Sequence, residues 1–593
     1  MLFKQFAEQL DRLEALSGRN EITGLLSATV GSMDKSEIAA GCYLILGKLR
    51  PDFEGVELGL GEKLLIRALA EATGVSNKAV SEMYHSRGDL GLVAYELKSK
   101  QKSALLDSYT MSKGLTVLDV HSKLVKIAKT SGEGAQTAKI KGVIELLTLC
   151  SPVEAKYVLK FSTGDLRLGF AEQTLLAALA AAFADGDKEA VERAFNLTSD
   201  VGYVAELLAE GGVKAVANVR VTPGRPLKPM LAERASSLEE ILERMGGKAA
   251  FEYKYDGERV QAHSVKGDIV LFSRRGEKIS DHYPDVVRNL KEALRSETFI
   301  VEGEIIAVEP STGEMLPFQQ LMHRRRKYDV EKAAEKFPTK TMLFDIAYAD
   351  GTDYIPQPYL KRRKALSELL KPSEFVETTV SEIISDKERA LKFFEQAVES
   401  GCEGVMAKTL EDIGYKAGKR GWAWIKYKRD YRADLTDTLD LVVVGGFYGR
   451  GKRAGKIGGY LLAAFNESDG TFETVCKVAT GFSDKDLEAI PKILQPWLIP
   501  LKHPTVKAKI EADFWYKPHI LMEISGAELT LSPIHTAALS VVQKDSGLAV
   551  RFPRFTGKIR TDKSPDEATT SRELVEMYRS QIKQIPQTPG KEV

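Results

Sequence analysis

The strongest constraint on the fold is a change of hydrophobic periodicity at a Pro- and Gly-rich stretch, VTPGRPLKPMLA, at residues 221–232. Before it, apolar residues recur at three- and four-residue spacing, as in KIKGVIELLTLC, which is typical of amphipathic helices. After it, short β-branched runs such as TFIVEGEIIAV alternate with helical segments. A single hydrophobic core does not normally extend over 593 residues. The linker between the helical pattern and the mixed strand and helix pattern therefore indicates a domain boundary.

Three domains are expected from these sequence patterns. Residues 1–220 are predicted to form an all-α domain, and residues 221–432 an α+β domain. From LDLVVVGGFYGRGKRAGKIGGYLLAAF onward, strands and glycine turns dominate. We therefore expect a small β-barrel within residues 433–593, ending near residue 560 and followed by a helical tail, SRELVEMYRSQIK.

Apolar runs and cysteine usage exclude several classes of protein. The run LLAALAAAF at 175–183 is too short to cross a membrane, and the charged N-terminus has no apolar signal core. We expect an intracellular protein, cytoplasmic and nucleoid-associated or nuclear according to its source. The four cysteines are far apart and form no CxxC pair, which argues against disulfides and a cysteine zinc site. The only metal expected is one held by oxygen ligands.

Charge points weakly to a phosphate-bearing partner. The net charge is only +1, but basic clusters occur at residues 324–327, 361–364, 426–432 and 450–456. Each cluster alone is typical of a solvated face, whereas four of them favour a phosphate-bearing partner. The loop GRGKRAGKIGG has the wrong glycine spacing for a P-loop, and Ile457 stands where Ser or Thr is required.

Lys254, in the segment EYKYDGER, is the candidate nucleophile. A lysine between aromatic residues and before Asp-Gly is, in isolation, equally typical of a strand end that enters a turn. A lysine amine has a pKa of about 10.4 and has to lose its proton before it attacks phosphorus. Desolvation, neighbouring cations or a metal ion can lower that pKa enough.

Two further strands supply the groups that such a nucleophile needs. Glu302 and Glu304 are two residues apart, so both are predicted on one strand face, which is a plausible seat for Mg²⁺. Lys426 and Lys428, in WAWIKYKRDY, also share a face, suit a phosphate chain and are expected to lower the pKa of Lys254. The alternatives are a solvent-facing strand edge for the first pair and lysines that oppose edge pairing for the second.

Taken together, these motifs resemble the covalent nucleotidyltransferase superfamily, and within it the ATP-dependent DNA ligases of archaeal and eukaryotic replicative type. EYKYDGER is similar to the first motif of that family and SRRGEKISDHYP to its second. FIVEGEIIA, LFDIAY, CEGVMAK, IKYK and RFPRFTGKIRTDKSPDEATT follow in the family's order. The match extends from about residue 130 to about residue 580, and this ordered series is far more specific than a lone KxDG.

The resemblance implies a role for each matching residue. Lys254 would be the adenylated lysine, Glu252 would read the adenine amino group, and Phe344 would stack on adenine. Glu304 and Glu403 would hold the metal, with Glu304 also at the ribose. The remaining ribose and phosphate contacts would come from Arg259, Arg274, Arg420, Lys426, Lys428, Arg560 and Lys563, the last two in an Arg-x-Asp-Lys core.

The same resemblance implies the reaction and its cofactors. The enzyme would use ATP and Mg²⁺, with Mn²⁺ as a second candidate, to seal 5′-phosphate/3′-hydroxyl nicks in duplex DNA. It would act through a lysyl-AMP and an adenylated DNA intermediate, in DNA replication, repair and recombination. The expected domains are an all-α DNA-binding domain with Arg167 on phosphate, an α+β nucleotidyltransferase (adenylation) domain and a β-barrel OB-fold. The helical domain and the barrel would close around the nick, in a monomer without a membrane partner.

One departure and several alternatives accompany this interpretation. Residues 101–106, QKSALL, lack the two aromatics that follow Gln-Lys-Ser in clamp-binding ligases, so a sliding clamp is only weakly supported as a partner. An RNA ligase or a GTP-dependent capping enzyme would share the lysine and strand motifs, but the helical first domain and TDKSPDEATT argue against both. An NAD-dependent ligase would ordinarily contain a zinc site made of clustered cysteines, and the scattered cysteines of this sequence argue against it. A non-catalytic nick sensor would have lost Lys254 or its carboxylates, which are present.

Overall fold

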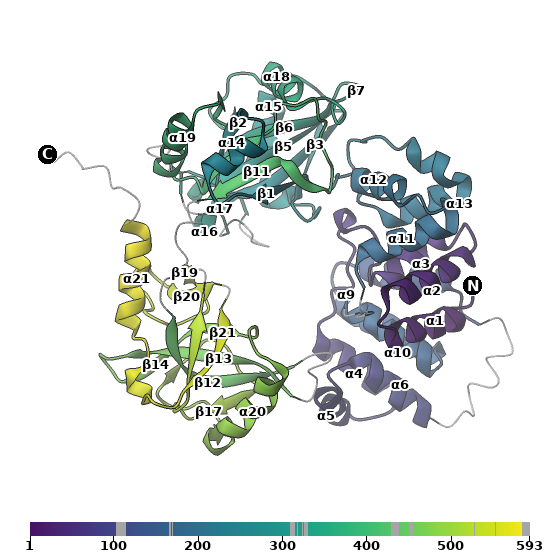
Figure 1. Ribbon diagram of the computed structural model, residues 1–593. Helices are drawn as coiled ribbons and strands as arrows, with labels where there is room; N and C mark the ends of the chain where they lie inside the picture. The colour runs from purple at the N-terminus through teal and green to yellow at the C-terminus, as the bar shows by residue number, and fades with distance from the viewer. Residues whose placement is uncertain are drawn as a thin grey trace. The chain divides into compact units, whose positions relative to one another are not determined.

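The structure is a computed structural model in which the chain forms two compact units (Figure 1). One unit comprises residues 1–80 and 90–429, and the other residues 81–89 and 430–593. The structure describes residues 1–101, 114–164, 166, 168, 170–308, 315–316, 318–322, 324, 330–428, 438–449, 456–526, 528–551 and 553–583. Arg167 and residues 102–106, two features of the sequence interpretation, lie outside these ranges.

The first unit begins with a helical region, as the three- and four-residue spacing predicts. Local sequence fixes several helix starts: Thr116 and Asp119 form a capping box, and Ser151 and Glu154 form another with Pro152 in the first turn. The helices are α1 (Phe3–Ala15), α2 (Arg19–Gly31), α3 (Ile38–Ile45), α4 (Glu62–Thr73), α6 (Leu90–Lys100), α8 (Val117–Lys129), α9 (Ala135–Leu149), α10 (Pro152–Thr163), α11 (Glu172–Phe183), α12 (Lys188–Thr198) and α13 (Val201–Ala217). Helix α5 (Asn77–Arg87) begins in the first unit, and its residues from 81 onward belong to the second.

The middle of the chain folds into two sheets flanked by helices. One sheet has the order β1-β11-β10-β2-β9, and the other the order β4-β3-β5-β6-β7 with β8 pairing β6. The strands of the first are β1 (Leu231–Arg234), β11 (Arg420–Lys428), β10 (Gly404–Lys408), β2 (Ala249–Lys254) and β9 (Ser381–Ile384). Those of the second are β3 (Glu258–Val265), β4 (Asp268–Ser273), β5 (Phe299–Ala307), β6 (Thr339–Ala349), β7 (Thr352–Asp353) and β8 (Val376–Thr378).

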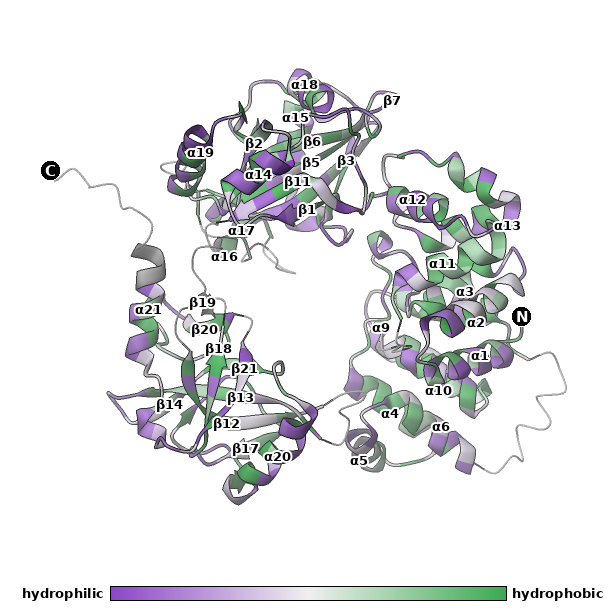
Figure 2. Cartoon of the chain, viewed as in Figure 1, coloured by the Kyte–Doolittle hydropathy of each residue, from purple (hydrophilic) through white to green (hydrophobic). Residues whose placement is uncertain are grey.

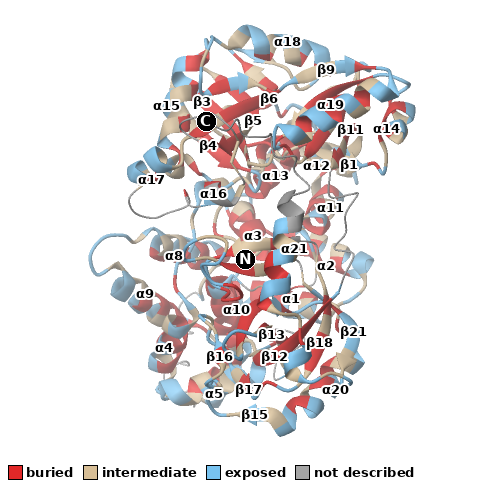
Figure 3. Ribbon diagram, turned by 90° about the vertical axis from the view of Figure 1, so that its left-hand side faces the viewer, coloured by how far each residue is buried: buried red, intermediate tan, exposed pale blue. Residues whose placement is uncertain are grey.

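Helices cover the outer faces of this α+β region. Figure 2 shows apolar residues along β5 and β6, whereas the outward faces of α14 and α19 are hydrophilic. Figure 3 shows the same contrast as burial, with β5 and β6 buried and much of α18 exposed. The helices are α14 (Leu238–Arg244), α15 (Pro284–Ala293), α16 (Phe318–Met322), α17 (Val330–Lys336), α18 (Tyr359–Leu369) and α19 (Lys387–Glu399).

The registers of these strands decide which side chains face the space between the sheets. In the antiparallel pairing of β2 with β10, Lys254 is opposite Gly404. In the pairing of β3 with β5, Arg259 is opposite Glu304. The turn between β2 and β3 passes so close to β5 that a Cβ on Gly257 would lie 2.2 Å from the carbonyl oxygen of Ile305. Only glycine fits there, which explains the Asp-Gly after the lysine.

The second unit is dominated by a sheet that forms a half-barrel, so the predicted sequence of helical, α+β and strand-rich regions is confirmed. The main path is β15-β17-β12-β13-β14-β16, with β18 joining β12 to β21, and β19 pairs with β20. Helix α21 (Ser571–Lys583) is the predicted tail. The other elements are β12 (Leu439–Tyr448), β13 (Ile457–Asn466), β14 (Thr471–Val478), α20 (Asp484–Leu494), β15 (Leu498–Ile499), β16 (Val506–Lys507), β17 (Phe514–Tyr516), β18 (Leu521–Ser525), β19 (Glu528–Ser532), β20 (Gly547–Arg551) and β21 (Arg554–Arg560).

None of the described helices has both the length and the apolar character that a membrane crossing requires.

Candidate active site

A cavity in the middle of the first unit is lined by side chains from both sheets. Residues of β1, β2, β10 and β11 form one side, and residues of β3, β5 and β6 contribute to the other. Eight of the predicted site residues line it: Glu252, Lys254, Arg259, Arg274, Glu304, Phe344, Arg420 and Lys426. The structure therefore brings together residues that are up to 174 positions apart in the sequence, as the motif order implied.

Lys254 ends β2 at the cavity wall and is fixed by the neighbouring strand β10. Its ammonium donates to the carboxylate of Glu403, and that carboxylate also lies 2.7 Å from the ammonium of Lys428. The backbone N–H of Glu403 donates to the carbonyl oxygen of Lys254 at 2.8 Å. Glu403 and Lys428 therefore lie beside the candidate nucleophile, as predicted from their motifs.

The charge around Lys254 differs from the prediction that Lys426 and Lys428 lower its pKa. Burial alone favours the neutral amine, but the carboxylates of Glu403, Glu304 and Asp256 outweigh burial, so the pKa of Lys254 is raised. The same environment lowers the pKa of Lys426, through burial first and then the neighbouring lysines. The prediction was wrong because carboxylates, and not cations, are the charges that act most strongly on Lys254.

Glu304 on β5 brings a further carboxylate to the cavity, close to Lys254. Burial raises its pKa to about 7, although Lys254 and Arg259 oppose that shift. Asp256, in the turn after Lys254, also has a raised pKa through burial and the charge of Glu403. Three carboxylates share this corner, so an added cation would relieve their mutual repulsion.

These carboxylates suit Mg²⁺ better than a metal held wholly by protein. Among the described residues, no group of three or more His, Cys, Asp or Glu side chains is arranged to hold a metal ion. Mg²⁺ typically takes one or two carboxylates and completes its shell with substrate phosphates and water. Glu304 and Glu403, which face the candidate nucleophile, fit that pattern.

The common parity of Glu302 and Glu304 suggested a shared role in holding a metal, but Glu302 has a different role. Its carboxylate is 2% exposed and accepts from Arg259 at 3.1 Å and from the hydroxyl of Tyr415 at 2.7 Å. A register shift between Glu302 and Gly303 interrupts the pairing of β5 with β6. Glu302 is thus a structural partner of Arg259, and Glu304 alone of this pair lines the cavity.

The aromatic part of the wall is built around Phe344 on β6. Its ring makes an edge contact with Trp424, with 6.1 Å between centroids, and the guanidinium of Arg259 lies over it at 5.2 Å. The backbone of Met230 is held beside this cluster, because its N–H donates to the hydroxyl of Tyr415 at 2.8 Å. The linker segment therefore closes one side of the cavity.

Cations line the open part of the cavity. Arg274 and Arg420 are both exposed, and Arg420 donates to the carbonyl oxygen of Ala232 on β1 at 3.1 Å. Lys426 is partly buried on β11. Arg420 and Lys426 lie on β11 and Arg274 follows β4, so two separate segments provide a positive rim suited to a phosphate chain.

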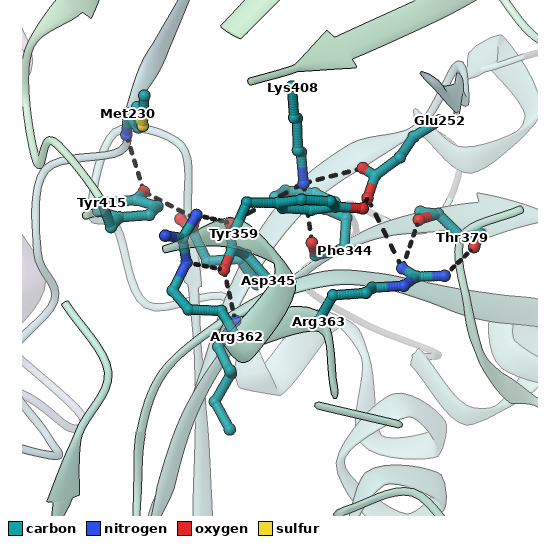
Figure 4. Close-up of polar contacts among 12 residues, drawn as sticks. Met230, Glu252, Phe344, Asp345, Tyr359, Arg362, Arg363, Thr379, Lys408 and Tyr415 are labelled. Carbon is teal, nitrogen blue, oxygen red and sulfur yellow. Dashed lines mark hydrogen bonds and ion pairs between the residues drawn. The ribbon is translucent and has the colours of Figure 1, made fainter. Parts of the chain in front are cut away.

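Sequence reasoning missed a polar network behind this wall (Figure 4). Lys408, at the end of β10, lies 2.8 Å from Glu252 and donates to the carbonyl oxygen of Phe344 at 2.9 Å. Arg362 on α18 forms a two-pronged ion pair with Asp345, at 2.7 and 3.0 Å. One signal was available: Tyr359, Arg362 and Leu366 are spaced at three and four positions, which marks them as the inner face of α18.

Some residues of the basic clusters are buried in the fold. Arg324 is 0% exposed and pairs with Asp285, and Arg362 is 2% exposed, so neither belongs to a solvated face. Residues 325–327, 429–432 and 450–455 of the basic clusters lie outside the described residues.

Arg560 and Lys563 belong to the second unit, where they share one carboxylate. Asp440, near the start of β12, lies 2.6 Å from the Nη1 of Arg560 and 2.7 Å from the Nζ of Lys563. Arg560 also pairs with Asp562 at 2.7 Å. The Arg-x-Asp-Lys residues thus form a compact charged group on the half-barrel, together with Asp440, which sequence reasoning did not single out.

Three family models match the chain in order. They are described as "DNA ligase N terminus" over residues 2–180, "ATP dependent DNA ligase domain" over residues 229–428 and "ATP dependent DNA ligase C terminal region" over residues 453–563. The middle match contains every predicted site residue of the first unit.

Similar proteins cover the chain almost completely. "DNA ligase 2" of Thermofilum pendens is 50% identical over 588 residues, covering 98% of this chain and 98% of that relative. "DNA ligase" of Saccharolobus solfataricus is 46% identical over 597 residues, covering 100% and 99%. The solved structure called "Pmar-Lig_PreS3" shares the fold, with a TM-score of 0.52, 18% identity and coverage of 94% of this chain and 99% of that one.

Proposed function

The chain belongs to the family of ATP-dependent DNA ligases, and from this premise we propose which residues carry out its reaction. The resemblance inferred from the motifs is confirmed, and so is ATP-dependent joining of DNA as the activity. The proposed assignment begins with Lys254 as the residue that carries AMP. The single observation that supports it is the position of this amine in a cavity with carboxylates on one side and phosphate-binding cations on another.

In the first step, the amine of Lys254 loses its proton and attacks the α-phosphorus of ATP. A nitrogen–phosphorus bond forms, and the bond to the leaving pyrophosphate breaks. Arg420, Arg274, Lys426 and Lys428 would neutralise the phosphates of the bound nucleotide, and Arg259 would contact the ribose or a phosphate. Arg560 and Lys563 would neutralise the pyrophosphate as it leaves.

The adenine would lie between aromatic and acidic side chains. Phe344 offers its ring for stacking, and Glu252 offers carboxylate oxygens to the amino group of the base. The two residues line the same cavity as Lys254, and Glu252 lies two positions before Lys254 on β2, hence on the same strand face. The adenine of one nucleotide would therefore lie beside Glu252 while its α-phosphate lies beside Lys254.

Glu304 and Glu403 would hold a Mg²⁺ ion, with Mn²⁺ as a second candidate, and Glu304 would also approach the ribose. A bound divalent cation supplies neutralisation of phosphate charge and helps to lower the pKa of a nearby amine. The carboxylates that raise the pKa of Lys254 would then be occupied by the cation, which removes their effect on the amine.

Two further steps complete the reaction on DNA. The 5′-phosphate at a nick attacks the AMP phosphorus, and the Lys254 nitrogen takes up a proton as its bond to phosphorus breaks, which restores the neutral amine. The 3′-hydroxyl then loses its proton and attacks the 5′-phosphate, and AMP leaves. The enzyme positions the reactants and offsets their charge, as is usual in phosphoryl transfer.

We propose the domain boundaries at residues 220 and 432, which give a helical DNA-binding domain, an adenylation domain and an OB-fold domain. The nicked duplex would be held through its backbone and shape and not its base sequence. A monomeric enzyme inside the cell, in replication, repair and recombination, is the setting that we propose. A sliding clamp remains a weakly supported partner.

Incubation of the protein with α-³²P-labelled ATP, GTP or NAD⁺, followed by denaturing electrophoresis, tests the assignment. Label from ATP alone, carried on the peptide that contains Lys254, is the expected result. Label on another residue would overturn the role of Lys254, and label from GTP or NAD⁺ in preference to ATP would overturn the assignment of the cavity to ATP.

A further inference from the structure

The carboxylate of Glu252 is surrounded by three donors from other elements (Figure 4). Its Oε1 accepts from the hydroxyl of Tyr359 at 2.6 Å and lies 3.7 Å from the Nη1 of Arg363. Its Oε2 lies 2.8 Å from the Nζ of Lys408. Glu252 is 2% exposed, so these donors, and not solvent, determine how its carboxylate is oriented.

Two of the three donors come from the first turn and a half of α18. Tyr359 and Arg363 are four positions apart, which places them on one face of the helix. Arg363 is fixed in turn, because its Nη1 donates to the hydroxyl of Thr379 at 3.0 Å. Thr379 itself lines the cavity.

The ion pair between Arg362 and Asp345 holds α18 against β6. Arg362 and Asp345 are 2% and 1% exposed, and their two hydrogen bonds are 2.7 and 3.0 Å long. The Arg362 guanidinium also donates to the carbonyl oxygen of Gln357 at 2.7 Å. Breaking a buried pair of this kind is strongly destabilising, so the start of α18 is a rigid support for Tyr359 and Arg363.

This arrangement presents Glu252 to the cavity as an acceptor only. Every contact that the structure gives its carboxylate brings a donor toward it, and a carboxylate donates no hydrogen bond itself. Its remaining lone pairs match an amino group at C6 of a purine. A carbonyl oxygen at C6 is disfavoured, because two hydrogen-bond acceptors would then face each other without water between them.

We propose that Tyr359 and Arg363 are positioning residues for base selection. They hold the Glu252 carboxylate in one orientation, so that the enzyme accepts 6-amino purine nucleotides and rejects 6-oxo purine nucleotides. The inference rests on the proposed function, since it places the base beside Glu252. Without these two donors, Glu252 keeps Lys408 on one oxygen only, and the carboxyl group is free to turn away from the base or to present a hydroxyl to a 6-oxo group.

The test compares ATP with ITP, whose bases differ at C6 and in the proton on N1. The rate of nucleotide transfer to Lys254 is measured against concentration for each nucleotide, with the full chain and Mg²⁺. The variants are Tyr359→Phe, Arg363→Met and both together. Lys361→Met, which removes an exposed charge from the same helix, is the matched control, and Arg363→Lys tests partial rescue.

Loss of the Tyr359 hydrogen bond, or of the Arg363 ion pair, to the Glu252 carboxylate should raise KM for ATP about 10-fold in each single variant, while kcat falls less than about threefold. The preference for ATP over ITP, as a ratio of kcat/KM, should fall at least about 10-fold in the double variant. Arg363→Lys should recover part of that loss, and Lys361→Met should match the unchanged chain. A merely structural role would lower activity with both nucleotides equally and leave the ratio constant.

An unchanged ratio in variants with the melting temperature of the original chain overturns the inference. If the double variant does not fold, Tyr359→Phe decides alone, because it removes a single oxygen atom. If the original chain uses ATP and ITP equally well, base selection by Glu252 is overturned, but Lys254 keeps its role. If it forms no adduct with ATP at all, the proposed function fails as well.

Discussion

The ammonium of Lys254, at the end of β2, and the carboxylate of Glu403, just before β10, form an ion pair, and the same carboxylate binds Lys428 at 2.7 Å. The pair fixes the position of the proposed nucleophile, but it also stabilises the protonated amine, which cannot attack phosphorus. Binding of nucleotide and metal would have to change the charge around Lys254 before the attack on phosphorus.

The first prediction concerns the reactivity of Lys254 in the absence of metal and ATP. Its pKa lies above the ordinary value of 10.5, so half-maximal labelling by dinitrofluorobenzene should occur above that pH. Glu403→Gln should move the Lys254 midpoint downward, because it removes the main group that raises the pKa. Peptide mass spectrometry provides the measurement. An unmoved midpoint in Glu403→Gln would show that the ion pair does not control the amine.

Lys254→Ala should abolish labelling by α-³²P-ATP, since the proposed acceptor of AMP is gone. Sealing of a pre-adenylated nick should persist, because the last step needs no lysine nucleophile. Lys254→Arg is the matched control: it keeps the charge beside Glu403, but a guanidinium stays protonated and cannot attack. Undiminished labelling of either variant would reject Lys254 as the acceptor.

Phe344→Ala should weaken the use of ATP more than the sealing of a pre-adenylated nick. Base–aromatic stacking is worth about 1–3 kcal/mol, so KM for ATP should rise about 5- to 150-fold. Phe344→Tyr retains a ring and should stay close to the original value. The measurement is the rate of AMP adduct formation against ATP concentration, and an unchanged KM in Phe344→Ala would make Phe344 a packing residue only.

Much of this site could be predicted from the sequence, because strand periodicity reports which side chains share a face. Lys426 and Trp424 line the cavity together, as their alternate spacing implied. The parity argument failed at Glu302, because Arg259 and Tyr415 bind that carboxylate. Side-chain partners from other strands are not encoded in the spacing of one strand.

The network behind Glu252 could not be predicted for a similar reason. Tyr359 and Glu252 are 107 positions apart, and only the tertiary fold makes Tyr359 a donor to that carboxylate. The cluster at residues 361–364, taken alone, is typical of a solvated face, yet Arg362 is buried against Asp345. Charge runs do not reveal which of their members turn inward, whereas the spacing of Tyr359, Arg362 and Leu366 did contain that information.

Glu304→Gln should stabilise the protein at alkaline pH. Burial raises the pKa of Glu304 from its ordinary 4.5 to about 7, so the folded state binds more protons than the unfolded state between these values. Stability from this group therefore falls as pH rises through that window, and the full penalty, about 1–3 kcal/mol, is present above pH 7. The melting temperature of Glu304→Gln should exceed that of the original chain by a few degrees at pH 8, with a smaller difference at pH 5.

Added Mg²⁺ extends this stability measurement to the metal site. If Glu304 helps to hold the cation, Mg²⁺ should raise the melting temperature of the original chain at pH 8 more than that of Glu304→Gln. Equal effects of Mg²⁺ on both proteins would remove Glu304 from the metal site. A variant that is less stable than the original chain at pH 8 would contradict the penalty itself.

Arg560→Ala combined with Lys563→Ala should impair transfer of AMP from ATP to Lys254 and leave the sealing of a pre-adenylated nick nearly intact. These cations are proposed to neutralise pyrophosphate, which is present in the first step only. Loss of preorganised charge stabilisation typically costs about 100-fold or more in rate. Both steps are measured separately, with α-³²P-ATP for the first and a pre-adenylated nicked duplex for the last.

Asp440 makes this division of labour testable in a second way. Its carboxylate holds Arg560 at 2.6 Å and Lys563 at 2.7 Å, so Asp440→Asn should disorder both cations without removing either. The first step should then slow by less than in the double variant, and the last step should again be nearly unaffected. Arg572→Ala, which removes an exposed charge that pairs along α21 with Glu576, is the matched control. If the double variant loses both steps equally, Arg560 and Lys563 act on something other than the leaving pyrophosphate, and their assignment fails.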